Sequence, residues 1–199
     1  MKKLKSNLQN MVLVLVSVAL ICGGTLAYVN QLTKPAIDLQ AEKALADGIK
    51  AVLATDNLVV KNKSEIKRNV NGKEQTFVIY NTDKGVAVQS TDPNAFSGNL
   101  TVLVGFDAEG VIKGYTILAH AETPGLGAKA TEWFQEGQPG NIVGINPANA
   151  NLTVKNDGGD INAITASTIT SRAFLRAVQQ AYVTFVESNS KESAGETEK

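Results

Sequence analysis

The first feature of the chain is a long run of apolar residues close to its beginning. Between Met11 and Val29 only Ser17, Gly23, Gly24 and Thr25 fall outside the apolar set. A helix of this length rises about 1.5 Å per residue and spans roughly 28 Å, close to the bilayer core of about 30 Å. The pattern predicts one transmembrane helix over residues 11–29.

Charge predicts the orientation of this helix. Three lysines precede the apolar run and none lies within it, so residues 1–10 are expected in the cytoplasm and the chain after Val29 on the other side of the membrane. A cleaved signal peptide is the alternative, because Thr25-Leu26-Ala27 fits a small-residue cleavage site. Both interpretations place most of the chain outside the cytoplasm.

The apolar residues then recur at helical spacing. They are Ile37, Ala41, Ala44, Leu45, Ile49 and Val52, with charged residues between them. This three- and four-residue spacing predicts an amphipathic helix over 35–53. Pro35 suits the first turn of such a helix.

In the middle of the chain the apolar period changes to two, which is typical of strands. The alternation predicts strands at 65–70, 75–81, 85–90, 100–106 and 111–119. Asn71-Gly72 and the segment Asp107–Gly110 are turn sequences that join neighbouring strands as hairpins. Successive hairpins indicate an antiparallel sheet.

A second helix pattern closes the chain. Residues 173–186 carry an apolar line formed by Phe174, Val178, Ala181, Tyr182 and Phe185. Residues 152–155 are predicted as an additional edge strand, and the Ser-, Glu- and Lys-rich residues 187–199 as a disordered tail. The expected fold class is α+β, with an antiparallel sheet and packed helices forming one extracytoplasmic domain over residues 30–186, preceded by the transmembrane helix.

Composition excludes several classes of function. The 199 residues contain 19 basic and 19 acidic side chains, one His and one Cys, so a nucleic-acid binder, an internal disulfide and the usual zinc sites are not expected. The chain has no Walker loop, His-Glu-x-x-His or Cys-x-x-Cys motif. We therefore predict no metal site and no catalytic side chain.

Two segments contain residue patterns that suit ligand binding as well as structure. The first is His120–Gly127, placed between the last predicted strand and a short helix predicted around 130–134. Pro124-Gly125 fits the centre of a type II turn, since Pro sets φ and Gly accepts a positive φ. Such a turn offers free backbone N–H groups to a ligand. His120 itself is interpreted as a structural residue at a strand end.

The second segment, Ala163–Arg172, directly precedes the closing helix and is rich in hydroxyl side chains. Its simplest interpretation is helix capping. The free amides and the positive end of the helix dipole also favour a phosphate there. Arg172 offers a basic group close by.

Together these segments resemble a known family. Glu122–Gly127 reads Glu-Thr-Pro-Gly-Leu-Gly, and a Ser/Thr-Gly-Ala-Thr-like segment follows about forty residues later. The pair is similar to the FMN-binding domain found in the G subunit of the Rnf electron-transport complex and in the C subunit of the sodium-translocating NADH:quinone reductase. The resemblance covers the whole chain, and its compact length favours the Rnf protein.

The resemblance implies an FMN esterified to Thr168 by a separate flavin transferase that uses FAD as donor. The family pattern Asp-x-x-Ser/Thr-Gly-Ala-Thr falls on residues 162–168, with departures at Asn162, Ala166 and Ser167. The implied cofactor contacts are Glu122, Thr123, Gly125, Leu126, Thr165, Ala166, Ser167, Ile169 and Thr170.

The implied function is electron relay through FMN in a bacterial inner-membrane complex that couples ferredoxin and NAD to movement of sodium ions or protons. Other membrane subunits would be its partners. The alternatives are an FMN-binding regulatory or accessory reductase module, and a cofactor-free envelope binding protein in which both motifs are only turns and caps.

Overall fold

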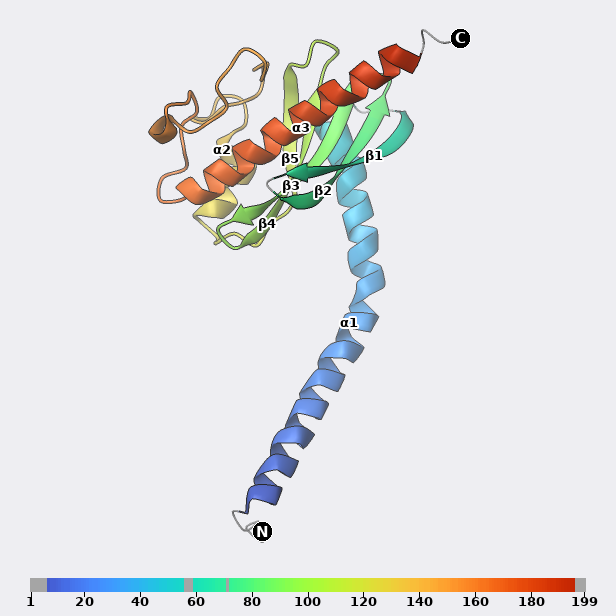
Figure 1. Ribbon diagram of the computed structural model, residues 1–199, viewed down its shortest axis with the longest axis vertical. Coiled ribbons are helices and arrows are strands. Elements are labelled where there is room, and N and C mark those ends of the chain that lie inside the picture. The colour runs from blue at the N-terminus through green and yellow to red at the C-terminus, as the bar shows by residue number, and fades with distance from the viewer. Residues whose placement is uncertain (1–6, 56–58, 71, 196–199) are drawn as a thin grey trace. The chain divides into compact units, whose positions relative to one another are not determined.

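The computed structural model describes residues 7–55, 59–70 and 72–195. It contains the long helix α1 (Leu8–Val52), a five-stranded sheet, and a C-terminal helix α3 (Figure 1). The strands are β1 (Val60–Val70), β2 (Lys73–Thr82), β3 (Val86–Ala95), β4 (Gly98–Phe106) and β5 (Ile112–Ala119). They pair antiparallel in chain order, so the predicted α+β class is confirmed.

Helix α1 joins two segments that the sequence predicted as separate. It runs without a break through Pro35, whose ring removes one helical hydrogen bond. The carbonyl left without its donor belongs to Gln31, which is exposed, so solvent can replace the lost bond. Among the described residues, α1 is the one helix long and apolar enough to cross a membrane. The chain divides into two compact units, Met1–Lys43 and Ala44–Lys199.

In the second unit, the end of α1 packs on one face of the sheet. Ile49 and Val52 join Tyr80, Ala87 and Leu103 in a small apolar cluster. Gly105 and Gly114 stand opposite each other on β4 and β5. A Cβ on Gly105 would collide with the Val52 carbonyl oxygen, and one on Gly114 would lie 3.2 Å from Val52 Cα. These glycines therefore allow the helix backbone to approach the sheet closely.

The opposite face of the sheet is covered by α3 (Thr168–Gly195) (Figure 1). As the apolar line predicted, Phe174, Val178, Ala181 and Phe185 are buried there, and Tyr182 packs against them half-buried. Their partners on the sheet include the inward side chains of β4, such as Phe106, which stacks on Phe185 with ring centroids 5.1 Å apart. This is the main hydrophobic core.

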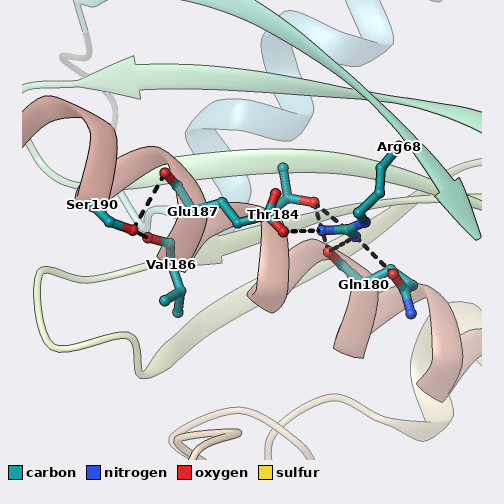
Figure 2. A network of polar contacts seen from close by, with 6 residues as sticks. All are labelled: Arg68, Gln180, Thr184, Val186, Glu187 and Ser190. Atoms are coloured by element: carbon teal, nitrogen blue, oxygen red, sulfur yellow. Dashed lines mark hydrogen bonds and ion pairs between the residues drawn. The ribbon is translucent and has the colours of Figure 1, made fainter.

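The predicted disordered tail is instead helical up to Gly195, and residues 196–199 lie outside the described residues. Extending a formed helix costs little once its packed part has nucleated it. Arg68 of β1 also binds the C-terminal half of α3, including Glu187 at the start of this extension (Figure 2). It donates to Glu187 Oε1 at 3.0 Å, to Gln180 Oε1 at 2.7 Å and to Thr184 Oγ1 at 3.3 Å.

The connection from β5 to α3 contains the short helix α2 (Ala130–Trp133), as predicted, between the 3₁₀ turns η1 (Gly127–Lys129) and η2 (Lys155–Asp157). The predicted edge strand at 152–155 is wrong, since only one isolated bridge, Val154 to Ile161, forms there. Leu152 and Val154 are buried in the core cluster with α3. Their apolar character reflects that packing. The Leu152 carbonyl accepts a hydrogen bond of 2.9 Å from the Gln179 side chain of α3 and has no neighbouring strand as its partner.

Candidate functional site

The two motif segments meet at one cavity of about 340 Å³. The loop after β5 provides one wall and the first turn of α3 provides another, although about forty residues of sequence separate them. The lining residues are Phe96, Glu122, Thr123, Leu126, Gly127, Ala166, Ser167, Thr168, Ile169 and Thr170. A volume of this size is in the range of ligand pockets, about 300–1,000 Å³.

The loop wall is shaped by a tight turn. The N–H of Leu126 donates to the Thr123 carbonyl at 3.2 Å, and Gly125 has φ +76°. This positive φ is what the third position of a type II turn requires, as the sequence predicted. Gly125 shapes the turn but does not line the cavity. The turn places Leu126 at the cavity, where its side chain is 43% exposed.

Glu122 is the buried acid of the site. Its Oε2 accepts a hydrogen bond of 2.6 Å from the Thr170 hydroxyl, and its Oε1 accepts one of 3.0 Å from the backbone N–H of Ser97. A Cβ on Gly127 would collide with Glu122 Oε2 and lie 2.8 Å from Thr170 Oγ1. Only glycine at position 127 leaves room for this pair. The carboxylate thus joins three separate segments of the chain.

The helix wall begins with a strained residue. Ala166, at the family's glycine position, has φ +61°, one of two non-glycine residues with positive φ among those described. The side chain of Ser171 holds the segment in place, since its hydroxyl donates to the Ser167 carbonyl at 3.0 Å and accepts from the Ile164 N–H at 2.9 Å. These contacts set the start of α3 at Thr168.

Thr168 is half-buried and lines the cavity. Within the described part of the chain, its hydroxyl has no hydrogen-bond partner in the protein. The first N–H groups of an α-helix also lack partners inside the helix. The cavity therefore combines a free hydroxyl with the positive end of the α3 dipole.

Arg172 does not reach the cavity. It forms a bidentate pair with Asp157, with nitrogen–oxygen distances of 2.6 and 2.7 Å. The hydrogen bonds from this guanidinium lower the pKa of the Asp157 carboxyl. No Lys or Arg is among the described residues that line the cavity, so the helix dipole is its principal positive field.

Most of the predicted site residues are brought together, with two differences. Thr165 is exposed and does not line the cavity, and Gly125 acts through the turn. Phe96 and Gly127 line it without having been predicted as contacts. Phe96 was missed because no turn was predicted between β3 and β4, where it stands. His120 is exposed and outside the cavity, where its Nδ1 accepts the Glu122 N–H at 3.2 Å.

Asn162, at the family's acidic position, forms hydrogen bonds that hold neighbouring loops together. Its side-chain amide donates to the Pro139 carbonyl at 2.6 Å, and its own carbonyl accepts from Trp133 Nε1 at 2.9 Å. A carboxylate could not donate the first of these bonds. The departure from the family pattern thus has a local structural role.

Comparison with known proteins agrees with this arrangement. Residues 1–52 match the RnfG N-terminal region and residues 96–183 match the FMN-binding domain. The G subunit of the ion-translocating oxidoreductase complex of Aliivibrio fischeri is 32% identical, over 86% of this chain and 86% of the relative. The G subunit from Escherichia coli is 34% identical, over 79% and 81%, and that from Shewanella amazonensis is 31% identical, over 90% and 88%. The chain therefore belongs to the family formed by the G subunits of ion-translocating oxidoreductase complexes and carries that family's FMN-binding domain.

Proposed function

We propose that the cavity holds FMN and that Thr168 carries it through a phosphodiester bond. The observation that carries this proposal is the position of the Thr168 hydroxyl, which lacks a hydrogen-bond partner among the described residues and lines the same cavity as the Glu122–Gly127 loop. The chain is then a membrane-anchored subunit that relays electrons within an ion-translocating complex.

The lining residues fit the two ends of FMN. The amides of the first turn of α3 and the hydroxyl of Ser167 suit the phosphate, whose negative charge the helix dipole stabilises. Phe96, Leu126 and Ile169 are large apolar side chains at the same cavity, which suits the flat ring system. Gly127 keeps the space between the walls free of a side chain.

Attachment requires a maturation partner, a flavin transferase with FAD as donor. The Thr168 oxygen forms the new phosphorus–oxygen bond, the diphosphate bond of FAD breaks, AMP leaves and the hydroxyl proton is released. Thr168 is an anchor and moves no proton afterwards. Bound FMN supplies reversible electron transfer, while the protein positions it and sets its potential.

The place of the domain in the cell follows from the charge pattern. Three lysines precede the apolar stretch of α1, so we place the short N-terminus in the cytoplasm and the FMN domain outside it. A covalent bond is useful there because a cofactor lost outside the cell is not recovered. The relatives are subunits of ion-translocating complexes, and we expect this chain to act with other membrane subunits of that kind, coupling ferredoxin and NAD to ion movement.

The test is coexpression of the full chain with an active flavin transferase. The denatured protein band should fluoresce under ultraviolet light, and the peptide containing Thr168 should gain the mass of FMN less one water. Thr168→Ala should lose both signals. Thr131→Ala is the control, because Thr131 is an exposed hydroxyl outside both motif segments and outside the cavity, and it should keep them.

Other outcomes separate the alternatives. A Thr168→Ala protein that still fluoresces would reject Thr168 as the attachment residue. An unmodified wild-type chain beside an active transferase would favour a module that binds FMN without a covalent bond or a cofactor-free envelope protein. Equilibrium binding of free FMN to the wild-type chain then distinguishes these two.

A further inference from the structure

Three large apolar side chains stay exposed around the cavity. Phe96 is 65% exposed, Leu126 43% and Ile169 49%. Each would gain free energy by leaving water, because burial of apolar surface is favourable. Exposed apolar groups gathered at one cavity indicate a surface that a ligand covers.

Phe96 stands at the tip of the turn that joins β3 to β4. Ala95 and Gly98 are paired across this turn, and Gly98 has φ +118°. The next residue, Ser97, donates its backbone N–H to Glu122 Oε1 at 3.0 Å. The turn that carries Phe96 is therefore tied to the loop wall of the cavity.

Glu122 is well suited to hold this turn in place. It is only 6% exposed, and Thr170 binds its other oxygen from the start of α3. A buried carboxylate with two such bonds does not exchange them for water without cost. The same side chain thus links the turn of Phe96 to the helix that begins at Thr168.

We propose that the Phe96 ring packs against the isoalloxazine ring of the FMN and that Glu122 acts as the positioning residue for this contact. The inference rests on the proposed function. An aromatic face is the natural partner for a flat, conjugated ring, and Phe96 is the only aromatic among the described residues that line the cavity. The carboxylate serves to hold the wall, since both its oxygens already accept bonds from the protein.

Replacement of Phe96 by tryptophan tests the contact, because an indole against a flavin quenches its fluorescence by electron transfer. Full-length Phe96→Trp protein, flavinylated and kept in detergent, should show native flavin emission several-fold below that of the wild type. After denaturation the two should emit equally. Val186→Trp is the control, since Val186 is 45% exposed on α3 and does not line the cavity, and its emission should stay unchanged.

A second measurement uses a smaller side chain. In Phe96→Ala the flavin should be quenched more strongly by iodide than in the wild type, because one face of its ring becomes open to solvent. If both the tryptophan and the alanine variants behave as wild type, Phe96 does not touch the flavin. In that case Phe96 stays exposed in the protein that carries FMN, and a protein partner would be the group that covers it.

The positioning role of Glu122 is tested in the Phe96→Trp protein. Glu122→Gln can still accept the Ser97 N–H and can bond Thr170 through its amide, so the quenching should persist. Glu122→Ala loses both bonds, and the quenching should weaken. Equal quenching in the two variants would reject the positioning role. If the denatured band of the wild-type protein carries no flavin, the proposed function fails. If the flavin is present but its emission does not change when residue 96 is replaced, only this inference is overturned.

Discussion

The Thr170 hydroxyl donates a hydrogen bond of 2.6 Å to Oε2 of Glu122, which stands 48 residues earlier in the chain. Both side chains are buried, with exposed fractions of 1% and 6%. The bond joins the loop after β5 to the first turn of α3, the two walls of the cavity. It is the most direct link between the two motifs of the sequence.

Replacing Thr170 by valine should show how much the bond between Thr170 and Glu122 contributes to the stability of the fold. Valine keeps the shape of the side chain but leaves the buried carboxylate short of one donor, which should lower the free energy of unfolding by roughly 1–3 kcal/mol. The measurement is denaturant unfolding of the full chain in detergent. Thr131→Val is the control, since the Thr131 hydroxyl bonds to Ala128 O at an exposed position, and its effect should stay within about 0.5 kcal/mol. Equal effects of the two changes would contradict the prediction.

Ala166→Gly should stabilise the protein. Ala166 has φ +61°, a conformation that costs an L-residue roughly 1–2 kcal/mol and glycine almost nothing. After the larger entropy of glycine in the unfolded chain is subtracted, a gain of about 0.5–1 kcal/mol remains. Ala163→Gly is the opposite control, because φ at that position is not positive, and it should lower stability. A loss of stability in both variants would show that residue 166 carries no strain.

Tyr115→Phe should destabilise the core beside α2. The Tyr115 hydroxyl donates to the Ala130 carbonyl at 2.7 Å and accepts from the Phe134 N–H at 3.1 Å. Phenylalanine removes both of these hydrogen bonds at a buried position, so the free energy of unfolding should fall by about 1–3 kcal/mol. Tyr182→Phe is the control, because its hydroxyl makes no hydrogen bond among the described residues. Unchanged stability of Tyr115→Phe would mean that these groups find other partners.

The same tyrosine predicts a dependence on alkaline pH. Burial raises the pKa of Tyr115 above its ordinary value of 10.0. The folded state therefore keeps a proton that the unfolded state releases above pH 10, so this contribution to stability is present below pH 10 and is lost as the pH rises further. Unfolding measured between neutral pH and strongly alkaline pH should show a steeper decline for the wild type than for Tyr115→Phe. Parallel declines would contradict the shift.

Arg68→Lys tests the contacts that hold the C-terminal half of α3 against β1 (Figure 2). Lysine keeps the charge but cannot reach Glu187, Gln180 and Thr184 at once, nor place a planar guanidinium 4.6 Å from the centre of the Phe77 ring. We expect a loss of about 1–2 kcal/mol. Glu187→Ala should cost less, within about 1 kcal/mol, because this carboxylate is 40% exposed.

Lys63→Ala on the same strand provides the baseline. Its pair with Glu65 is exposed and 3.7 Å long, so the effect should be close to zero. An Arg68→Lys loss no larger than this baseline would show that the network does not hold the helix.

Local pattern was sufficient to predict the five strands, the helical segments and most of the residues at the site. The alternation of β4 reports its two faces, since Val102 and Val104 face α3 while Leu103 faces the end of α1. The sequence also predicted the turn at Pro124-Gly125 and the hydroxyl-rich start of α3. Turns and helix caps depend on the residues that form them, so a short segment is enough to predict each one. The resemblance to the FMN-binding family follows from the same short segments.

Only the tertiary structure decided which of these segments meet. No local signal tells that Glu122 binds Thr170, that Phe96 stands at the same cavity, or that Arg172 turns to Asp157. The apolar residues Leu152 and Val154 were predicted as part of a strand although they lie in a loop. A buried loop and a buried strand use the same apolar residues, so the local pattern cannot tell them apart. Periodicity reports the environment of each residue along its own element, whereas contacts between distant segments depend on how the packed elements bring them together.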